Sequence, residues 1–143
     1  MRLRSFLAAA AAVLLAGAGA SGAGAEDASS GKLTIELNAL TPSQKGCMMT
    51  FVAENELPDA IGKISLELAF FNQKNVVDRL TVLDFKDLPV GRKRVRQFDM
   101  PNVSCDSVSR IIVNDAPVCD GPGPAACKAG LVTHSQLSVS FEG

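Results

Sequence analysis

The segment Ile64–Phe70 reads ISLELAF, and nearly every second residue in it is large and apolar. The segment Leu33–Ala39, LTIELNA, shows the same alternation. A period of two is typical of a β-strand with one buried and one exposed face, because successive side chains of a strand point to opposite sides. These two segments therefore predict a β-sheet domain.

Five further segments are predicted to be strands because they are rich in Val, Ile, Leu and Phe and lie between turn-forming residues. They are Cys47–Glu54, Val76–Phe85, Lys93–Met100, Val108–Asn114 and Leu131–Phe141. Asn72–Asn75 has the composition of a hairpin loop, whereas Pro117–Ala126 has too many Gly and Pro residues to pair in a sheet. No segment shows convincing helical periodicity. The chain is therefore predicted to be an all-β, seven-stranded antiparallel sandwich of the immunoglobulin or fibronectin kind, with a small β-barrel as the alternative.

The first 25 residues have the three parts of a secretory signal peptide. Arg2 and Arg4 form a basic start, Phe6–Ala16 is continuously apolar, and Ala23–Ala25 is a cleavage site of the A-x-A type. We expect cleavage after Ala25. The Ala- and Gly-rich composition of this leader predicts export to the bacterial periplasm.

The remaining chain is predicted to have a flexible start over residues 26–32 and one domain over residues 33–143. The full sequence carries 14 Lys and Arg residues against 15 Asp and Glu residues. This balance argues against a nucleic-acid partner, and no later segment has the roughly 18 apolar residues of a membrane helix. We therefore expect the partner to be another envelope or secreted protein.

All four cysteines follow the leader, and an even number in a small exported domain predicts two disulfides. In the predicted sandwich, Cys47 begins the second strand and Cys105 precedes the sixth, which runs in the same direction, so both lie at one end. Cys119 and Cys127 bracket a loop at the other end. The predicted bonds are therefore Cys47–Cys105 and Cys119–Cys127. With no C-x-x-C motif and with His134 as the only histidine, we expect neither a metal nor a cofactor.

The segment Arg92–Arg96, RKRVR, is the strongest candidate for a binding surface. Arg92, Arg94 and Arg96 are predicted to project from one face of a strand, with Lys93 between them, at a spacing of roughly 6.6 Å. Such a row suits an acidic protein surface, a lipid headgroup or an anionic glycan. The alternative is an edge strand whose charges prevent edge-to-edge pairing. In that case the acidic partners across the sheet are expected among Glu67, Asp78 and Asp84.

The loop from Cys119 to Cys127, CDGPGPAAC, is the second candidate. A short loop closed by a disulfide and stiffened by proline loses little conformational entropy on binding. Its candidate contact residues are Asp120, Gly121 and Pro122. The alternative is a pinned connection between two strands that has no partner.

Catalytic and metal-binding constellations are weaker. A Ser-His-Asp triad would depend on His134, and no G-x-S-x-G motif accompanies it. Methionine and histidine suit copper, but Met48 and Met49 point to opposite faces of a strand, so core packing is the better interpretation of Met49 and Met100. We therefore name no catalytic residues and expect a protein that is not an enzyme.

A resemblance to a known family rests on the segments LTIELN (Leu33–Asn38), Gly46-Cys47, Thr50-Phe51, Asp78–Leu80, Asp84-Phe85 and Arg94–Phe98. It includes the spacing of Cys105, Cys119 and Cys127. In these features the chain resembles a family of small exported proteobacterial proteins known mainly by their Tat-type signal sequence. The resemblance implies an exported domain and supplies no catalytic residues. Leu3 stands where the twin-arginine motif has its first arginine, so ordinary Sec export is expected here.

Together these features predict a non-catalytic periplasmic interaction module with an accessory role in an envelope complex. Two alternatives stay open. One is an inhibitor of a secreted hydrolase that acts through the Cys119–Cys127 loop, and the other is a carrier of a small ligand or metal.

Overall fold

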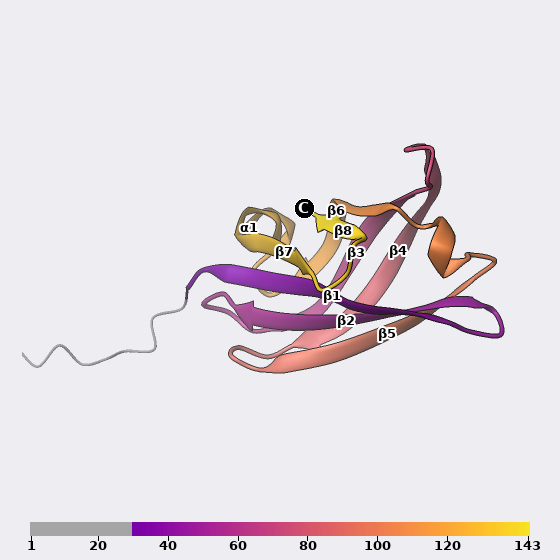
Figure 1. Cartoon of the computed structure of the whole chain (residues 1–143). Helices are drawn as coiled ribbons and strands as arrows, with labels where there is room; N and C mark the ends of the chain where they lie inside the picture. The colour runs from indigo at the N-terminus through magenta and orange to yellow at the C-terminus, as the bar shows by residue number, and fades with distance from the viewer. Residues whose placement is uncertain (1–29) are drawn as a thin grey trace, which may run out of the picture.

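The computed structural model describes residues 30–143 (Figure 1). The predicted signal peptide and its cleavage site lie outside the described residues, as do residues 26–29 of the predicted flexible start. The described chain contains eight strands, one short 3-10 turn (η1) and one short α-helix. In chain order they are β1 Lys32–Pro42, β2 Gly46–Glu56, β3 Ile61–Phe71, β4 Val77–Leu88, β5 Lys93–Pro101, η1 Cys105–Ser107, β6 Arg110–Asp120, α1 Pro124–Gly130, β7 Leu131–Ser135 and β8 Ser140–Glu142.

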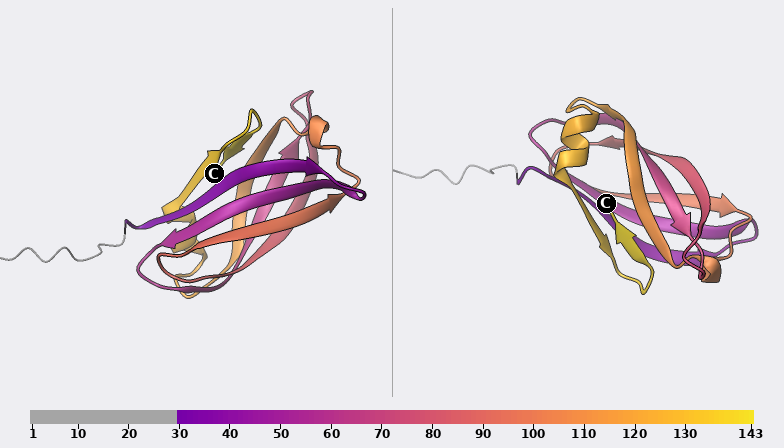
Figure 2. Two further views of the ribbon diagram at one scale, coloured as in Figure 1. Left: turned by 60° about the horizontal axis from the view of Figure 1, so that its bottom comes forward. Right: turned by 90° about the horizontal axis from the view of Figure 1, so that it is seen from above.

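The strands form two four-stranded sheets, which we call sheet A and sheet B. Sheet A has the order β5-β2-β1-β7 and sheet B the order β4-β3-β6-β8. The two sheets stack against each other, as Figures 1 and 2 show. The predicted all-β sandwich is therefore confirmed.

The period-two pattern becomes alternate burial. In β2, for example, Cys47, Met49, Phe51 and Ala53 are fully buried, while the residues between them face outward. Each fully buried large apolar side chain contributes about 1.5–3 kcal/mol relative to an exposed one. The alternation that identified the strands in the sequence is thus the feature that forms the core.

A cluster of phenylalanines joins the two sheets at the centre of the core. The ring of Phe51 in β2 lies 5.3 Å from that of Phe85 in β4 and 5.5 Å from that of Phe141 in β8. Phe98 in β5 lies 5.0 Å from Phe85. Tilted and edge-on contacts at such distances add about 0.5–1.5 kcal/mol per pair beyond their buried area.

Both predicted disulfides are present. Cys47 and Cys105 have their Cα atoms 5.1 Å apart and tie the start of β2 to η1. Cys119 and Cys127 have theirs 6.5 Å apart and tie the end of β6 to α1. The prediction placed these bonds at opposite ends of the sandwich, and the strand directions agree with it.

The segment after Val113 departs from the prediction. Strand β6 continues to Asp120, through Pro117, although Pro117–Ala126 was expected not to pair. The register of β6 against β3 shifts here, since Ser65 pairs with Val118 and Glu67 with Asp115. Pro117 therefore lies in a bulge, where a missing N–H group interrupts no regular ladder.

The predictions of no helix and of one last strand were wrong. Helix α1 begins with Pro124 in its first turn, where proline is favoured because its missing N–H has no helical partner. The predicted strand Leu131–Phe141 is divided into β7 and β8, which belong to different sheets and pair in parallel with β1 and β6. The other four pairings are antiparallel, as expected. No helix in residues 30–143 combines the length and the apolar composition required to cross a bilayer.

Candidate functional site

The basic segment Arg92–Arg96 begins in the turn between β4 and β5 and continues along β5, the edge strand of sheet A. Arg92 precedes the strand and is exposed. Arg94 and Arg96 pair in register with Ala53 and Phe51, whose side chains are buried, so the two arginines share the inner face of the strand. The edge position is the one that the alternative interpretation of this segment described. The three arginines do not form one outward-facing row.

Arg96 is held by the neighbouring strand β4. Its Nε donates to the carbonyl oxygen of Phe85 at 2.6 Å, and its Nη2 donates to the carbonyl oxygen of Asp87 at 2.8 Å. The Asp87 carboxylate lies 3.4 Å from the same nitrogen, and the Arg96 side chain is only 17% exposed. These contacts join the edge of sheet A to the edge of sheet B, so Arg96 has a structural role.

The acidic partners of the basic segment are not those expected from the sequence. Lys93 lies 3.9 Å from Glu54, and Arg96 contacts Asp87. Glu67 accepts a hydrogen bond from Asn114, and Asp84 pairs with Lys63. The sequence could not reveal these pairings because they depend on which strands are neighbours.

Two exposed valines accompany the exposed cations. Val90, in the turn before β5, is 46% exposed, and Val95, between Arg94 and Arg96, is 59% exposed. Arg92 and Lys93 are exposed and Arg94 is partly exposed. No ion pair of Arg92 or Arg94 occurs in the part of the chain that the structure describes. We call Val90, Arg92, Lys93, Arg94 and Val95 the basic rim.

The loop between Cys119 and Cys127 lies at the same end of the molecule as the basic rim, on the other side of the β2–β3 loop (Figure 1). Gly121 has φ +117°, and a Cβ atom there would overlap the carbonyl oxygen of Ala60. Glycine is therefore required for close packing of the backbone against the β2–β3 loop. Of the three candidate residues, Gly121 thus has a clear structural role. Asp120 is exposed and Pro122 is partly exposed.

Asn55 links these two surfaces from inside. Its fully buried side chain donates from Nδ2 to the carbonyl oxygens of Asp59 and Leu88, each at 2.9 Å, and accepts from the N–H of Leu57 at 3.0 Å. Its backbone carbonyl accepts from the N–H of Gly91 at 2.8 Å. Asn55 therefore fixes the β2–β3 loop against the turn that carries the start of the basic rim.

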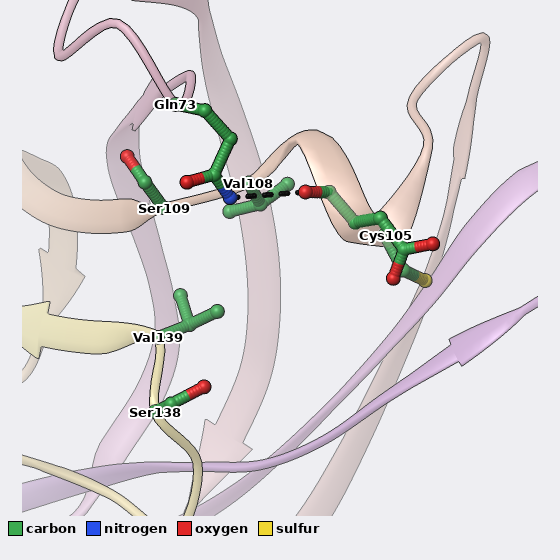
Figure 3. Close-up of a pocket in the computed structure, with 7 residues that line it drawn as sticks. Gln73, Cys105, Val108, Ser109, Ser138 and Val139 are labelled. Carbon is green, nitrogen blue, oxygen red and sulfur yellow. Dashed lines mark hydrogen bonds between the residues drawn. The ribbon is translucent and has the colours of Figure 1, made fainter.

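A pocket of about 320 Å³ lies at the opposite end, beside η1. Figure 3 shows Val108 and Val139 on its apolar side and Gln73 at its rim, where Gln73 Nε2 donates to the carbonyl oxygen of Asp106 at 3.0 Å. Its other lining residues are Cys105, Asp106, Ser109 and Ser138. The sequence reasoning missed this pocket, because Val139 and Ser138 were assigned to a continuous strand.

The residues considered for catalysis or metal binding are dispersed. His134 is exposed on β7, beside Glu36 of β1, and Met49 and Met100 are buried in the core. Within residues 30–143, no group of three or more His, Cys, Asp or Glu side chains is placed to hold a metal ion.

Among the carboxyl groups of residues 30–143, those of Glu36 and Asp115 have a pKa that clearly departs from its ordinary value. Hydrogen bonds from Gln136 and then from Asn38 lower the pKa of Glu36, and the positive charge of His134 lowers it further. A hydrogen bond from Lys128 lowers the pKa of Asp115. The lowered pKa keeps both carboxyl groups charged to a more acidic pH than usual.

Comparison with known proteins gives no relative from which a function can be carried over. No protein-family model matches the chain, no curated protein matches its sequence and no solved structure matches its fold.

Proposed function

We propose that the protein is a non-catalytic interaction module of the periplasm that binds an acidic segment of another envelope or secreted protein through the basic rim. The observation that carries this proposal is the exposure of Val90 and Val95, at 46% and 59%, next to the exposed cations Arg92 and Lys93. Lys93 and Val95 share the outer face of β5, and the partly exposed Arg94 lies on its other face. Apolar and cationic groups side by side give a surface that is able both to bury area and to attract opposite charge.

Charge complementarity determines the kind of partner. Arg92 and Arg94 carry no ion pair within the described residues, so an acidic segment would supply their missing partners. Such charges mainly raise the association rate and the specificity, while the valines contribute apolar burial. Because Arg96 is held by β4 and Asn55 fixes the preceding turn, the rim is rigid and loses little entropy on binding.

Three features support the periplasmic location. The first 25 residues read as a signal peptide, and the chain resembles a family of exported proteobacterial proteins. Both pairs of cysteines in the described chain form disulfides, which persist in oxidising compartments and are rare in the bacterial cytoplasm.

Photo-crosslinking in the native host tests this function. A photoreactive amino acid replaces Val95, and a control chain carries it at Asn38, an exposed position on β1. We expect one dominant adduct from position 95 that is absent from position 38, and mass spectrometry should identify an envelope or secreted protein with an acidic segment. A secreted hydrolase as the dominant adduct would instead favour the inhibitor function.

Charge reversal gives the second arm of the experiment. In the chain labelled at position 95, the variant Arg92→Glu/Arg94→Glu should abolish the adduct. The matched control Lys45→Glu/Lys74→Glu makes the same change in net charge with two exposed lysines at the opposite end. If both variants lose the adduct equally, or if neither variant loses it, the basic rim is rejected as the binding surface.

A further inference from the structure

The pocket beside η1 lies at the end of the sandwich opposite the basic rim, and the proposed function does not use it. Segments that are distant in sequence form its walls, namely η1, the β3–β4 hairpin with Gln73, and the β7–β8 loop with Ser138 and Val139. Figure 3 shows Ser138 and Val139 on one side of the pocket and Cys105 on the other. The volume of about 320 Å³ falls within the range of small-molecule sites, about 300–1,000 Å³.

Two of the walls are held by contacts of their own. The disulfide of Cys105 anchors η1 to β2. In the β3–β4 hairpin, Asn72 Oδ1 accepts hydrogen bonds from the N–H groups of Lys74 at 3.0 Å and Val76 at 3.1 Å. Ser109 Oγ donates to the carbonyl oxygen of Asn72 at 2.6 Å and so attaches the hairpin to the start of β6. These two walls therefore keep their shape without a ligand.

The third wall, the β7–β8 loop, is shaped by Ser135. Its Oγ donates to the carbonyl oxygen of Val139 and accepts from the N–H of Leu137 at 3.1 Å. The hydrogen bond from Gln73 to the carbonyl oxygen of Asp106 then joins the hairpin to η1 across the pocket rim. The pocket is thus preformed, and a preformed pocket loses little conformational entropy on binding.

The pocket is apolar at its floor and polar at its mouth. Val108 is only 4% exposed, and the partly buried Val139 packs against the hydrophobic core. Gln73, Asp106 and Ser138 are exposed. A ligand that fits this gradient has an apolar group, which contacts the valines, and a polar group, which stays at the mouth.

The polar groups at the mouth are acceptors without donors. Within residues 30–143, the Asp106 carboxylate, the Ser138 hydroxyl and Gln73 Oε1 take part in no hydrogen bond or ion pair. The lining residues include neither Lys nor Arg. Arg110, the first residue of β6, lies over the ring of Phe71 instead, 4.1 Å from its centre. The mouth therefore offers hydrogen-bond acceptors and one negative charge that no cation of the lining balances.

We propose that this pocket binds a small primary amine in its ammonium form, with the ammonium group at the mouth and a short apolar group at the floor. An ammonium group carries three donors and a positive charge, which complement the Asp106 carboxylate and the acceptors of Ser138 and Gln73. The apolar group buries its surface against Val108 and Val139. Because the pocket and the basic rim lie at opposite ends, this inference and the proposed function can fail independently.

NMR titration of the isotope-labelled chain tests the ligand class. The probes are leucinamide, tyramine and butylamine, each of which has an ammonium group and a short apolar group, and the N-acetyl derivative of each is its uncharged control. We expect at least one amine to shift the amide signals of Val108, Ser109 and Val139 until they saturate, with a dissociation constant of about 1 mM or lower. Its N-acetyl derivative should bind at least about tenfold more weakly. The absence of a saturable shift with all three amines overturns the proposal, as does equal binding of an amine and its N-acetyl derivative.

Substitutions test the position of the ligand. Asp106→Asn keeps the size of the side chain but removes its charge, so it should weaken amine binding about tenfold or more. Asp78→Asn is the matched control, since it removes an equal charge from an exposed residue that follows the same hairpin and does not line the pocket. Ser138→Trp should abolish binding, because it fills the mouth from an exposed loop position. Equal weakening by Asp106→Asn and Asp78→Asn, or unchanged binding in Ser138→Trp, would reject the site.

Discussion

The Nε atom of Arg96 lies 2.6 Å from the carbonyl oxygen of Phe85, so a charged side chain from the edge of one sheet completes the hydrogen bonding of the edge of the other. A reciprocal contact lies at the far end of the same two strands, where Nη1 of Arg79 in β4 donates to the carbonyl oxygen of Pro101 at 2.8 Å. The β4–β5 side of the sandwich is therefore joined by two arginine side chains where no backbone ladder connects the sheets.

Arg96→Ala is expected to lower the free energy of unfolding by about 1–3 kcal/mol, because two carbonyl groups lose a charged donor and the apolar stem is lost as well. Urea denaturation measures this change. Arg94→Ala is the matched control on the same face of β5 and should change stability by no more than about 0.5 kcal/mol. Arg96→Lys should recover only part of the loss, since one ammonium group lacks the planar fork that reaches two acceptors. Equal costs for Arg94→Ala and Arg96→Ala would contradict the structural role of Arg96.

The two disulfides should contribute unequally to the free energy of unfolding. Cys47 and Cys105 are 58 residues apart in sequence, and Cys119 and Cys127 are 8 apart. Because cross-linking removes more entropy from the unfolded chain when the closed loop is longer, Cys47→Ala/Cys105→Ala should cost about 4 kcal/mol and Cys119→Ala/Cys127→Ala about 2.5 kcal/mol. Thermal or urea unfolding of the two double variants gives the order. The reverse order would show that native packing around α1 outweighs loop entropy.

Asn55→Ala should be among the most damaging single substitutions in the molecule. The side chain is fully buried and satisfies two backbone groups in the β2–β3 loop and one at the end of β4, so its removal leaves buried polar groups without partners. We expect a loss of about 2–4 kcal/mol in urea denaturation. Asn114→Ala, at an exposed asparagine with one hydrogen bond to Glu67, serves as the control and should cost no more than about 0.5 kcal/mol. A small loss for Asn55→Ala would mean that water replaces the side chain in the loops.

The features of the fold that the sequence predicted are those set by local alternation. Segments such as Leu33–Ala39 and Cys47–Glu54 bury one face, and a strand of that pattern has few alternatives. The disulfide pairing followed from strand direction alone. The end of the chain was less predictable, because β7 and β8 are short and are partly buried by contacts with distant strands. The alternation across Leu131–Phe141 does not show that the chain passes from sheet A to sheet B between β7 and β8.

The candidate site was predictable only in its composition. The run of cations at Arg92–Arg96 is visible in the sequence, but the burial of Arg96 depends on the position of β4, which local pattern does not specify. Gly121 was identified as part of a rigid loop. Its contact with Ala60 could not be foreseen, since it joins loops that are far apart in sequence. The exposure of Leu80 and Val82, at 54% and 52%, on β4 was not predicted for a similar reason, because alternation marks which residues share a face and not whether another element covers it.

The last prediction concerns acid stability and Glu36. The folded-state pKa of this carboxyl group is lowered from its ordinary value of 4.5, chiefly by the hydrogen bond from Gln136. A lowered folded-state pKa stabilises the charged form in the folded protein. The resulting stability is fully present above the unfolded pKa and is lost as the pH falls through the folded pKa. Glu36→Gln should therefore reduce the loss of stability between neutral pH and the region below pH 4.5.

Gln136→Ala separates this cause from the other contacts of Glu36. Removal of its amide donor should raise the pKa of Glu36 toward its ordinary value, as followed by NMR titration of the side-chain carboxyl carbon. The remaining hydrogen bond from Asn38 Nδ2, at 3.1 Å, should keep part of the shift. An unchanged titration in Gln136→Ala would assign the shift to Asn38 and His134 instead. In that case Gln136, which directly follows β7, would not contribute to stability in acid.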